Sequence, residues 1–381
     1  MQRLDFTQSC VDDASWSRIS IMNPILGIIS YLSIVNLTVS LTAGRISPTR
    51  LMASLSSSSQ GSNPNVPLEG IKNFRDLSTA IQNSNLGIVQ SPRKILRSGC
   101  PSMATEADLA YLKEFDSIAL IDLRSPREWS RDKELDVGKV YDGYMNYRYS
   151  RMHKGWVKLD GSNPRFSIFS GSGLQDESER SKKKRFFVSL LNERRIARGV
   201  FMRLRKRMKV KVFLLGLLGA VSRRAQRAFR GAFFARLNDG GLSMLNEIVL
   251  DSAGPEIAAV MKVLSDDKNL PAAVFCTAGK DRTGIISCLV LSVLGASDTE
   301  ILSDYCHSDS VYADLASKEA MIMALEQTDV RPEVFLRAQP QTMKDTLQYI
   351  RQKYGGINKY LDRYGFTDTY RNKLRNTLLV F

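Results

Sequence analysis

The chain has 381 residues, and its 43% apolar and 24% charged residues are ordinary for a globular protein of one large or two smaller domains. Five cysteines without Cys-x-x-Cys spacing argue against a disulfide framework or a zinc site, and two histidines argue against a mechanism that needs several imidazoles. The net charge of +15 arises in one segment: residues 180–236 hold nineteen Lys or Arg and one acid, Glu193, so the remainder sums to −3. Such a segment is typical of contact with an anionic surface.

The first 65 residues differ in composition from the rest of the chain. Residues 19–43 contain no charge over a length that could span a bilayer, and residues 44–62 carry Ser and Arg but no acid. This pattern predicts either a signal plus transit-like address for a plastid or a membrane anchor at 19–43, with a buried core helix as the alternative. We expect residues 1–65 to lie outside a main domain at 66–381, and a basic helical insertion at about 176–238 within that domain.

The main domain alternates predicted helices and strands. The Thr-Glu-Ala-Asp sequence at 105–108 predicts the start of a helix at about 106–114, and a buried strand is predicted at 117–124. Strands alternating with helices predict an α/β fold, in which helices flank a mostly parallel sheet. The other predicted elements are a strand at 272–275 and helices at 251–264, 284–294, 341–354 and from Thr367 onward.

The basic segment has a helical pattern of its own. Apolar residues at every fourth position predict one helical stripe with Arg and Lys on the remaining surface, namely Ile196, Val200, Leu204, Met208 and Val212. A short apolar run at 212–221 follows, too short to span a bilayer. The segment is interpreted as a solvated hairpin docked by its stripe, or as an interfacial helix on an anionic membrane. Nucleic-acid binding is less favoured, because neither aromatic stacking positions nor a reader motif accompanies the charge.

Residues 274–284, VFCTAGKDRTG, place a thiol and charged side chains on one turn between a predicted strand and helix. Backbone N–H groups and the helix dipole converge at such a turn and favour a tetrahedral oxyanion. Cys276 opens the turn, where amides and cations favour the thiolate. Arg282 curls back to hold two phosphoryl oxygens, and Thr283 can donate its hydroxyl to the sulfur. The pattern predicts attack of sulfur on a phosphate monoester through a phospho-cysteine intermediate.

The leaving oxygen needs a proton, so a carboxylate near the rim is predicted to act as acid and then as base. Asp281, within the turn, is the first candidate; Asp122, near the end of a predicted strand, is the second, and Asp76 follows. A buried strand-end thiol is the competing interpretation of Cys276, which the residues at 279–283 disfavour. The Walker phosphate loop is excluded, because Asp281 stands where that motif needs Ser or Thr.

With this turn the chain resembles the cysteine-dependent tyrosine phosphatases, and specifically the atypical PtpB-type family (tyrosine phosphatase family 3) with dual protein and phosphoinositide activity. Further blocks in the same order support the resemblance, at 73–79 (NFRDLST), 96–128, 301–309 and 354–366. The resemblance implies Cys276 as nucleophile, Arg282 as phosphate clamp and Asp281 as a catalytic or orienting carboxylate. It also implies a substrate-binding set of Thr277, Ala278, Gly279, Lys280, Thr283, Asp76, Asp122 and Arg124, with Lys280 as a second cation for highly charged head groups. For Arg75, Asp76, Asp122 and Arg124, a salt-bridged scaffold role stays equally open.

Two positions depart from the family pattern. Phe275 stands where the family has a histidine before the nucleophile, and residues 77–79 read Leu-Ser-Thr in place of Leu-Gly-Gly. The preferred prediction is a hydrolase without metal or cofactor that acts on phosphotyrosine proteins, and also on phosphoserine, phosphothreonine or phosphoinositides. The alternative, supported by Phe275, is a phosphate-binding pseudophosphatase held at an anionic membrane by the insertion.

Overall fold

The computed structural model describes residues 68–81, 89–90, 93–115, 118–126, 128–129, 140–141, 143–159, 183–219, 221–311, 331, 334–335 and 337–380. Residues 1–65, with the hydrophobic segment 19–43, lie outside the described residues. The described part divides by contacts into a helical unit, residues 193–239 with Arg331, and a larger unit that comprises the rest.

The larger unit is built on a seven-stranded sheet with the order β1-β3-β8-β4-β7-β5-β6. Its strands are β1 (Arg75–Asp76), β3 (Ile95–Ser98), β4 (Ala119–Asp122), β5 (Met145–Ser150), β6 (Gly155–Leu159), β7 (Lys184–Phe187) and β8 (Ala272–Phe275). All pairs from β3 to β5 are parallel, whereas β1 and β6 pair antiparallel at the two edges. β2 (Val89–Gln90) and β9 (Leu379–Val380) form a separate antiparallel pair. The predicted mostly parallel sheet is confirmed.

β8 is buried on both faces, as the continuous apolar run Ala-Ala-Val-Phe indicates. Side chains alternate along a strand, so Val274 and Cys276 belong to one apolar core, while Ala273 and Phe275 belong to a second core. β3 and β4 flank β8 in register, with Ser98 and Asp122 both opposite Phe275. The carboxyl ends of these three parallel strands therefore lie side by side, and ligands of open α/β sheets bind at this end of the strands.

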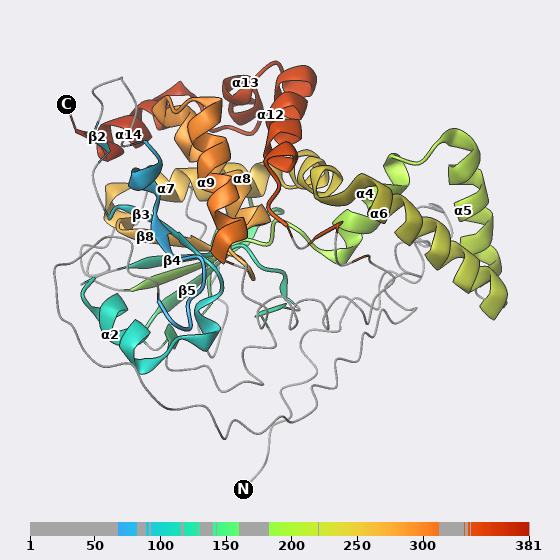
Figure 1. The fold of residues 1–381 in the computed structure, drawn as a ribbon, viewed down its shortest axis with the longest axis horizontal. Coiled ribbons are helices and arrows are strands. Elements are labelled where there is room, and N and C mark those ends of the chain that lie inside the picture. The colour runs from blue at the N-terminus through green and yellow to red at the C-terminus, as the bar shows by residue number, and fades with distance from the viewer. Residues whose placement is uncertain are drawn as a thin grey trace, which may run out of the picture. The chain divides into compact units, whose positions relative to one another are not determined.

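Helices cover both faces of this sheet (Figure 1). α2 lies on the face that carries the Phe275 core, and α7, α8 and α9 lie on the other face with α12, α13 and α14 beyond them. Their bounds are α2 (Glu106–Lys113), α7 (Gly254–Leu264), α8 (Asp281–Leu294), α9 (Asp298–Val311), α12 (Pro340–Tyr354), α13 (Ile357–Arg363) and α14 (Asp368–Leu378), with 3-10 turns η2 (Leu77–Ala80), η3 (Pro101–Met103) and η6 (Asp267–Asn269).

Most predicted elements are present, and their ends differ for local reasons. α2 begins with the predicted cap, because the Thr105 hydroxyl accepts from Asp108 N–H and the Asp108 carboxylate accepts from Thr105 N–H. A single helix at 251–264 is wrong: the chain breaks at Ala253, and Pro255 stands in the first turn of α7, where its missing N–H costs no helical hydrogen bond.

The helical unit contains α4 (Glu193–Met202), α5 (Lys206–Gly219) and the first part of α6 (Arg223–Ser252), which is two helices joined at Gly241 with φ 54°. The predicted unbroken stripe is wrong, because the chain leaves the helix after Met202 and restarts at Lys206. Four residues of an α-helix turn through about 400°, so side chains at every fourth position shift by about 40° around a straight helix from one to the next. The break lets Leu204 and Val212 pack with Phe229 in one small core. The run 212–221 largely belongs to α5 and is not a separate patch.

Among the helices that the structure describes, none combines the length and the hydrophobicity needed to cross a bilayer.

Candidate active site

The loop that joins β8 to α8 carries the residues singled out from the sequence. Cys276 leaves the central strand and is 3% exposed, and Arg282 lies in the first turn of α8, which begins at Asp281. Burial lowers the Arg282 pKa, but interaction with Glu128, and after it with Cys276, outweighs burial and raises the pKa. The structure therefore brings the predicted nucleophile and the predicted phosphate clamp to one point.

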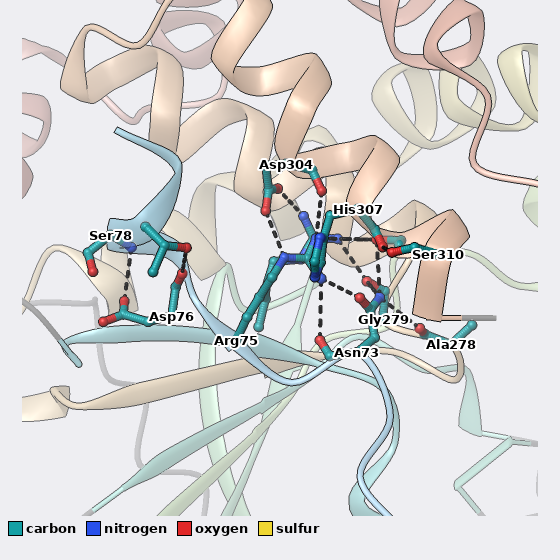
Figure 2. A network of polar contacts seen from close by, with 12 residues as sticks. Asn73, Arg75, Asp76, Ser78, Ala278, Gly279, Asp304, His307 and Ser310 are labelled. Carbon is teal, nitrogen blue, oxygen red and sulfur yellow. Dashed lines mark hydrogen bonds and ion pairs between the residues drawn. The ribbon is translucent and has the colours of Figure 1, made fainter. Parts of the chain in front are cut away.

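The carbonyl groups of residues 277–279 are held from outside the loop. The backbone N–H of Cys100 donates to the first at 3.0 Å, and Arg97 donates to the third at 2.8 Å. The Asn73 amide donates to the second and third at 3.2 and 2.8 Å (Figure 2). In a trans peptide the next N–H points opposite to the carbonyl. The N–H groups of residues 278–280 are thus turned away from these donors, as an oxyanion cradle requires.

Gly279 makes this loop possible. Its φ of 64° lies in the left-handed region, and a Cβ at this position would lie 2.2 Å from the carbonyl oxygen of Ser98. The loop therefore packs directly on the backbone at the end of β3, and a larger residue would have to displace it.

A buried polar network supports the loop from behind (Figure 2). Asp304 on α9 accepts from Arg75 Nε at 2.9 Å and forms an ion pair with Arg97. Burial alone would raise the Asp304 pKa, but the two guanidinium groups outweigh it and hold the pKa below its ordinary value. Arg75 also contacts the side-chain oxygen of Asn73, so the network orients both side chains that grip the loop. The scaffold interpretation of Arg75 fits this geometry.

Glu128 is a site residue that the sequence reasoning missed. Its two carboxylate oxygens accept from Arg282 Nη1 and Nη2 at 2.8 and 2.7 Å, and the Thr277 hydroxyl donates to the same carboxylate. Burial raises the Glu128 pKa and lowers the Arg282 pKa, but their mutual attraction is stronger: the Glu128 pKa is held far below its ordinary value and the Arg282 pKa is raised. Both groups therefore stay charged at neutral pH.

The position of Glu128 follows from a local capping motif after β4. The Glu128 carboxylate accepts from the Ser125 N–H at 2.9 Å, and the Ser125 hydroxyl accepts from the Glu128 N–H at 3.3 Å. This Ser-x-x-Glu capping box, with Pro126 at the first helical position, was visible in the sequence as a helix start. It fixes the carboxylate in place, and the carboxylate in turn fixes the Arg282 guanidinium beside the loop.

Asp281 and Lys280 are neighbours in the chain with different surroundings. Asp281 is partly exposed, and its Oδ1 accepts from the Tyr305 hydroxyl at 2.9 Å. Lys280 is 2% exposed, and its ammonium donates to the carbonyl of Phe335 at 2.7 Å and lies 3.8 Å from Asp281 Oδ2. The Lys280 charge is thus engaged by protein oxygens, an arrangement that favours a structural role over binding of a head group.

Asp122 has the surroundings of a structural ion pair. Its fully buried carboxylate accepts from Arg124 Nε and Nη2 at 2.9 and 2.8 Å and from Arg185 Nη2 at 2.7 Å. Burial would raise its pKa, but hydrogen bonds and attraction from both guanidinium groups lower it. Both Asp122 oxygens are bound by guanidinium groups and are closed to solvent, which speaks against Asp122 as the acid. Arg124 also lies 5.4 Å from the centre of the Phe275 ring.

The remaining candidates are Asp76 and Thr283. The Asp76 carboxylate accepts from the Ser78 N–H at 2.9 Å and caps η2, which explains how Leu77-Ser78-Thr79 turns without glycine. Thr283 is fully buried, and its hydroxyl forms no hydrogen bond within the described part of the chain, so the bond expected from Thr283 to the Cys276 sulfur is not seen.

A loop with outward-held carbonyls, a thiol and a fixed arginine at the carboxyl ends of parallel strands is the arrangement expected of a cysteine-dependent phosphatase. Comparison with known sequences agrees, since the family model described as "Tyrosine phosphatase family" matches residues 66–380. The chain belongs to this family.

Two relatives bear names of the same kind. The "Triple specificity protein phosphatase PtpB" of Mycobacterium tuberculosis is 32% identical over 121 residues, which span 29% of this chain and 44% of that protein. A "putative tyrosine-protein phosphatase" of Cupriavidus necator is 24% identical over 294 residues, 76% of this chain and 80% of the relative. The match to the mycobacterial protein thus spans less than half of its length.

Proposed function

We propose that the chain is a cysteine-dependent phosphomonoester hydrolase. The observation that carries the proposal is the loop at 276–282. Its carbonyl groups accept hydrogen bonds from Asn73 and Arg97, its first residue is a cysteine, and its arginine is held by two hydrogen bonds to Glu128. The Cys276 thiolate attacks phosphorus, an S–P bond forms and the P–O bond to the leaving group breaks. Asp281 gives its proton to the leaving oxygen. Water then attacks phosphorus, Asp281 takes the water proton, and the S–P bond breaks to release inorganic phosphate and the thiolate. No metal or cofactor enters these steps.

Phosphotyrosine in proteins is the substrate class that we propose first. Cys276 is almost fully buried, so a phosphate on a long aryl arm reaches the sulfur more readily than one on a short serine side chain. The name of the mycobacterial relative, a triple specificity protein phosphatase, supports testing phosphoserine and phosphothreonine as well. Phosphoinositides stay in the proposal with less support, because the Lys280 ammonium is already bound to the Phe335 carbonyl.

The pseudophosphatase alternative rests on Phe275, and the surroundings of that residue weaken it. Phe275 packs with Leu96 and Phe115 in the core on the α2 face of the sheet, whereas Cys276 belongs to the core on the opposite face. Replacement of histidine by phenylalanine here fills an apolar position and leaves the loop hydrogen bonds in place.

Trapping the covalent intermediate tests the proposal directly. Full-length protein mixed with a phosphotyrosine peptide and quenched in acid within milliseconds should carry one phosphate on Cys276, detected by mass spectrometry of the digested chain. A panel of phosphotyrosine, phosphoserine and phosphoinositide substrates then ranks the classes by kcat/KM. Turnover of substrate without a phosphorylated cysteine would contradict the mechanism, and absence of both would favour the pseudophosphatase.

Asp281→Asn tests the assignment of the acid. We expect kcat for a phosphotyrosine peptide to fall by about 10²-fold, because general acid catalysis typically contributes 10²–10⁴-fold. The loss should be much smaller for an aryl phosphate whose leaving phenol is acidic and needs no proton. Asp298→Asn, at an exposed acid that begins α9 and pairs with Arg351, is the matched control and should keep the wild-type rate. Equal losses on both substrates would point to another acid.

A further inference from the structure

Exposed aliphatic side chains occur along α5 from Val210 onward and in the turn that follows the helix. Five aliphatic side chains are between 51% and 88% exposed, namely Val210, Leu214, Leu217, Leu218 and Val221. Their spacing of four, three, one and three residues keeps them on one side of the helix and of the turn that follows it. Scattered apolar residues are normal on a protein surface, whereas a contiguous group of this kind marks a contact surface. We call these five side chains the α5 tip.

The small core of the helical unit does not need the α5 tip. That core is formed by Leu204, Val212 and Phe229 with their neighbours, and the other face of α5 contributes to it. Gly216 and Gly219 are also buried, so this side of the helix is covered closely without large side chains. The exposed aliphatic side chains are therefore additional to folding, and their exposure has a cost that a partner would remove.

Positive charge surrounds the α5 tip in the sequence on both sides. Residues 194–238 contain fourteen Lys or Arg and neither Asp nor Glu. Exposed basic side chains stand before the tip (Arg205, Lys206 and Arg207), within it between Val210 and Leu214 (Lys211), and after it in the first turns of α6 (Arg223, Arg224 and Arg227). Exposed aliphatic side chains among and between basic ones are the arrangement that suits an anionic lipid surface, where aliphatic groups enter the interface and cations contact phosphates.

Nucleic acid fits this surface less well. Single strands are held by aromatic side chains on which bases stack. The phenylalanines of α6 in this unit, Phe229, Phe233 and Phe234, are buried, and the exposed tip is purely aliphatic. A second copy of the chain fits poorly as well, because two such surfaces would bring their positive charges together.

We propose that the α5 tip docks the protein on an anionic membrane, with the aliphatic side chains in the interface and the flanking Lys and Arg on lipid phosphates. The proposal concerns binding and does not depend on the proposed hydrolysis. A Cys276→Ser protein should bind vesicles like the wild type, so failure of one proposal leaves the other standing.

The test uses full-length protein and vesicles of neutral lipid with or without 30% phosphatidylserine, a composition chosen for the experiment as roughly that of an anionic leaflet. In a flotation assay we expect the triple substitution Leu214→Ser, Leu217→Ser and Leu218→Ser to weaken binding to the anionic vesicles by at least about tenfold. All three side chains are more than half exposed, so the folded unit should be retained, which circular dichroism checks. Met152→Ser, at an 83% exposed apolar residue of the larger unit, is the matched control and should bind like the wild type.

A tryptophan probe separates the α5 tip from any other membrane-binding segment of the chain. Because the wild type already contains three tryptophans, each variant is compared with it. Leu217→Trp should add emission at shorter wavelength that brominated acyl chains quench, whereas the emission added by Met152→Trp should be neither shifted nor quenched by vesicles. The proposal is overturned if the triple variant binds anionic vesicles as well as the wild type, or if position 217 is not quenched. It is also overturned if the triple substitution leaves vesicle binding intact but abolishes oligonucleotide binding or self-association.

Discussion

Cys276→Ser is expected to reduce kcat for an aryl phosphate by at least about 10⁴-fold, because removal of a catalytic nucleophile causes losses of this order or more. A serine hydroxyl in the same position is almost entirely protonated at neutral pH, so neither the loop amides nor Arg282 can make it an effective nucleophile. The oxyanion cradle should survive, since its carbonyls are held by Asn73, Arg97 and Cys100 and not by the sulfur. The variant should therefore bind inorganic phosphate or vanadate while failing to turn over substrate. Initial rates and isothermal titration with vanadate provide the two measurements.

Cys288→Ser is the matched control for this substitution. Cys288 lies in α8 and is buried like Cys276, and burial raises the pKa of its thiol to about 12, so it stays neutral and unreactive. A hydroxyl at this position should lower the stability of the fold and leave kcat near the wild-type value. If both serine variants retained the wild-type rate, the nucleophile would lie elsewhere. If wild type and Cys276→Ser shared the same trace activity, the chain would bind phosphate without hydrolysing it.

The sequence predicted the parts of the site whose residues lie close together in the chain. Cys276, Gly279 and Arg282 stand within seven residues of one another, and a strand, a turn and a helix are recognisable on either side. The mostly parallel pairing of the strands also follows from alternation of strands and helices. These features depend on short-range patterns, which a single sequence displays.

The parts that the sequence could not predict depend on contacts between distant segments. Glu128 and Arg282 are 154 residues apart, and nothing near Glu128 except its capping motif sets it apart from other surface acids. Asp122 resembled a catalytic acid because it ends a strand. Its second partner, Arg185, arrives only when β7 pairs with β4, so the saturation of that carboxylate is a consequence of sheet order. Likewise, the apolar stripe at 196–212 did not predict the break at 203–205, nor the packing of Leu204 and Val212 against Phe229 of α6.

Arg282→Lys is expected to lower kcat/KM by about 10³-fold, as for other arginines that stabilise a transferring phosphoryl group. Lysine keeps the charge but offers one point of contact, whereas the guanidinium forms two parallel bonds to Glu128 and keeps further N–H groups for phosphoryl oxygens. Among the described residues the Arg282 Nε donates no hydrogen bond, and we expect this N–H to contact a phosphoryl oxygen of the substrate. Steady-state kinetics on a phosphotyrosine peptide measure the loss.

Glu128→Gln distinguishes two possible effects of Glu128: the carboxylate either positions Arg282 for the substrate or competes with the phosphate for the guanidinium. The carboxamide keeps the shape of the side chain but can accept only through one oxygen, so the guanidinium loses one of its two anchors. If Glu128 positions the clamp, kcat/KM should fall by up to about 10²-fold, the cost of a small misplacement of a catalytic group. The double variant Arg282→Lys with Glu128→Gln should then lose little more than Arg282→Lys alone, because residues that act through one contact are not additive. An increase of kcat/KM in Glu128→Gln would mean instead that the carboxylate occupies the place of the phosphate and must leave before substrate binds.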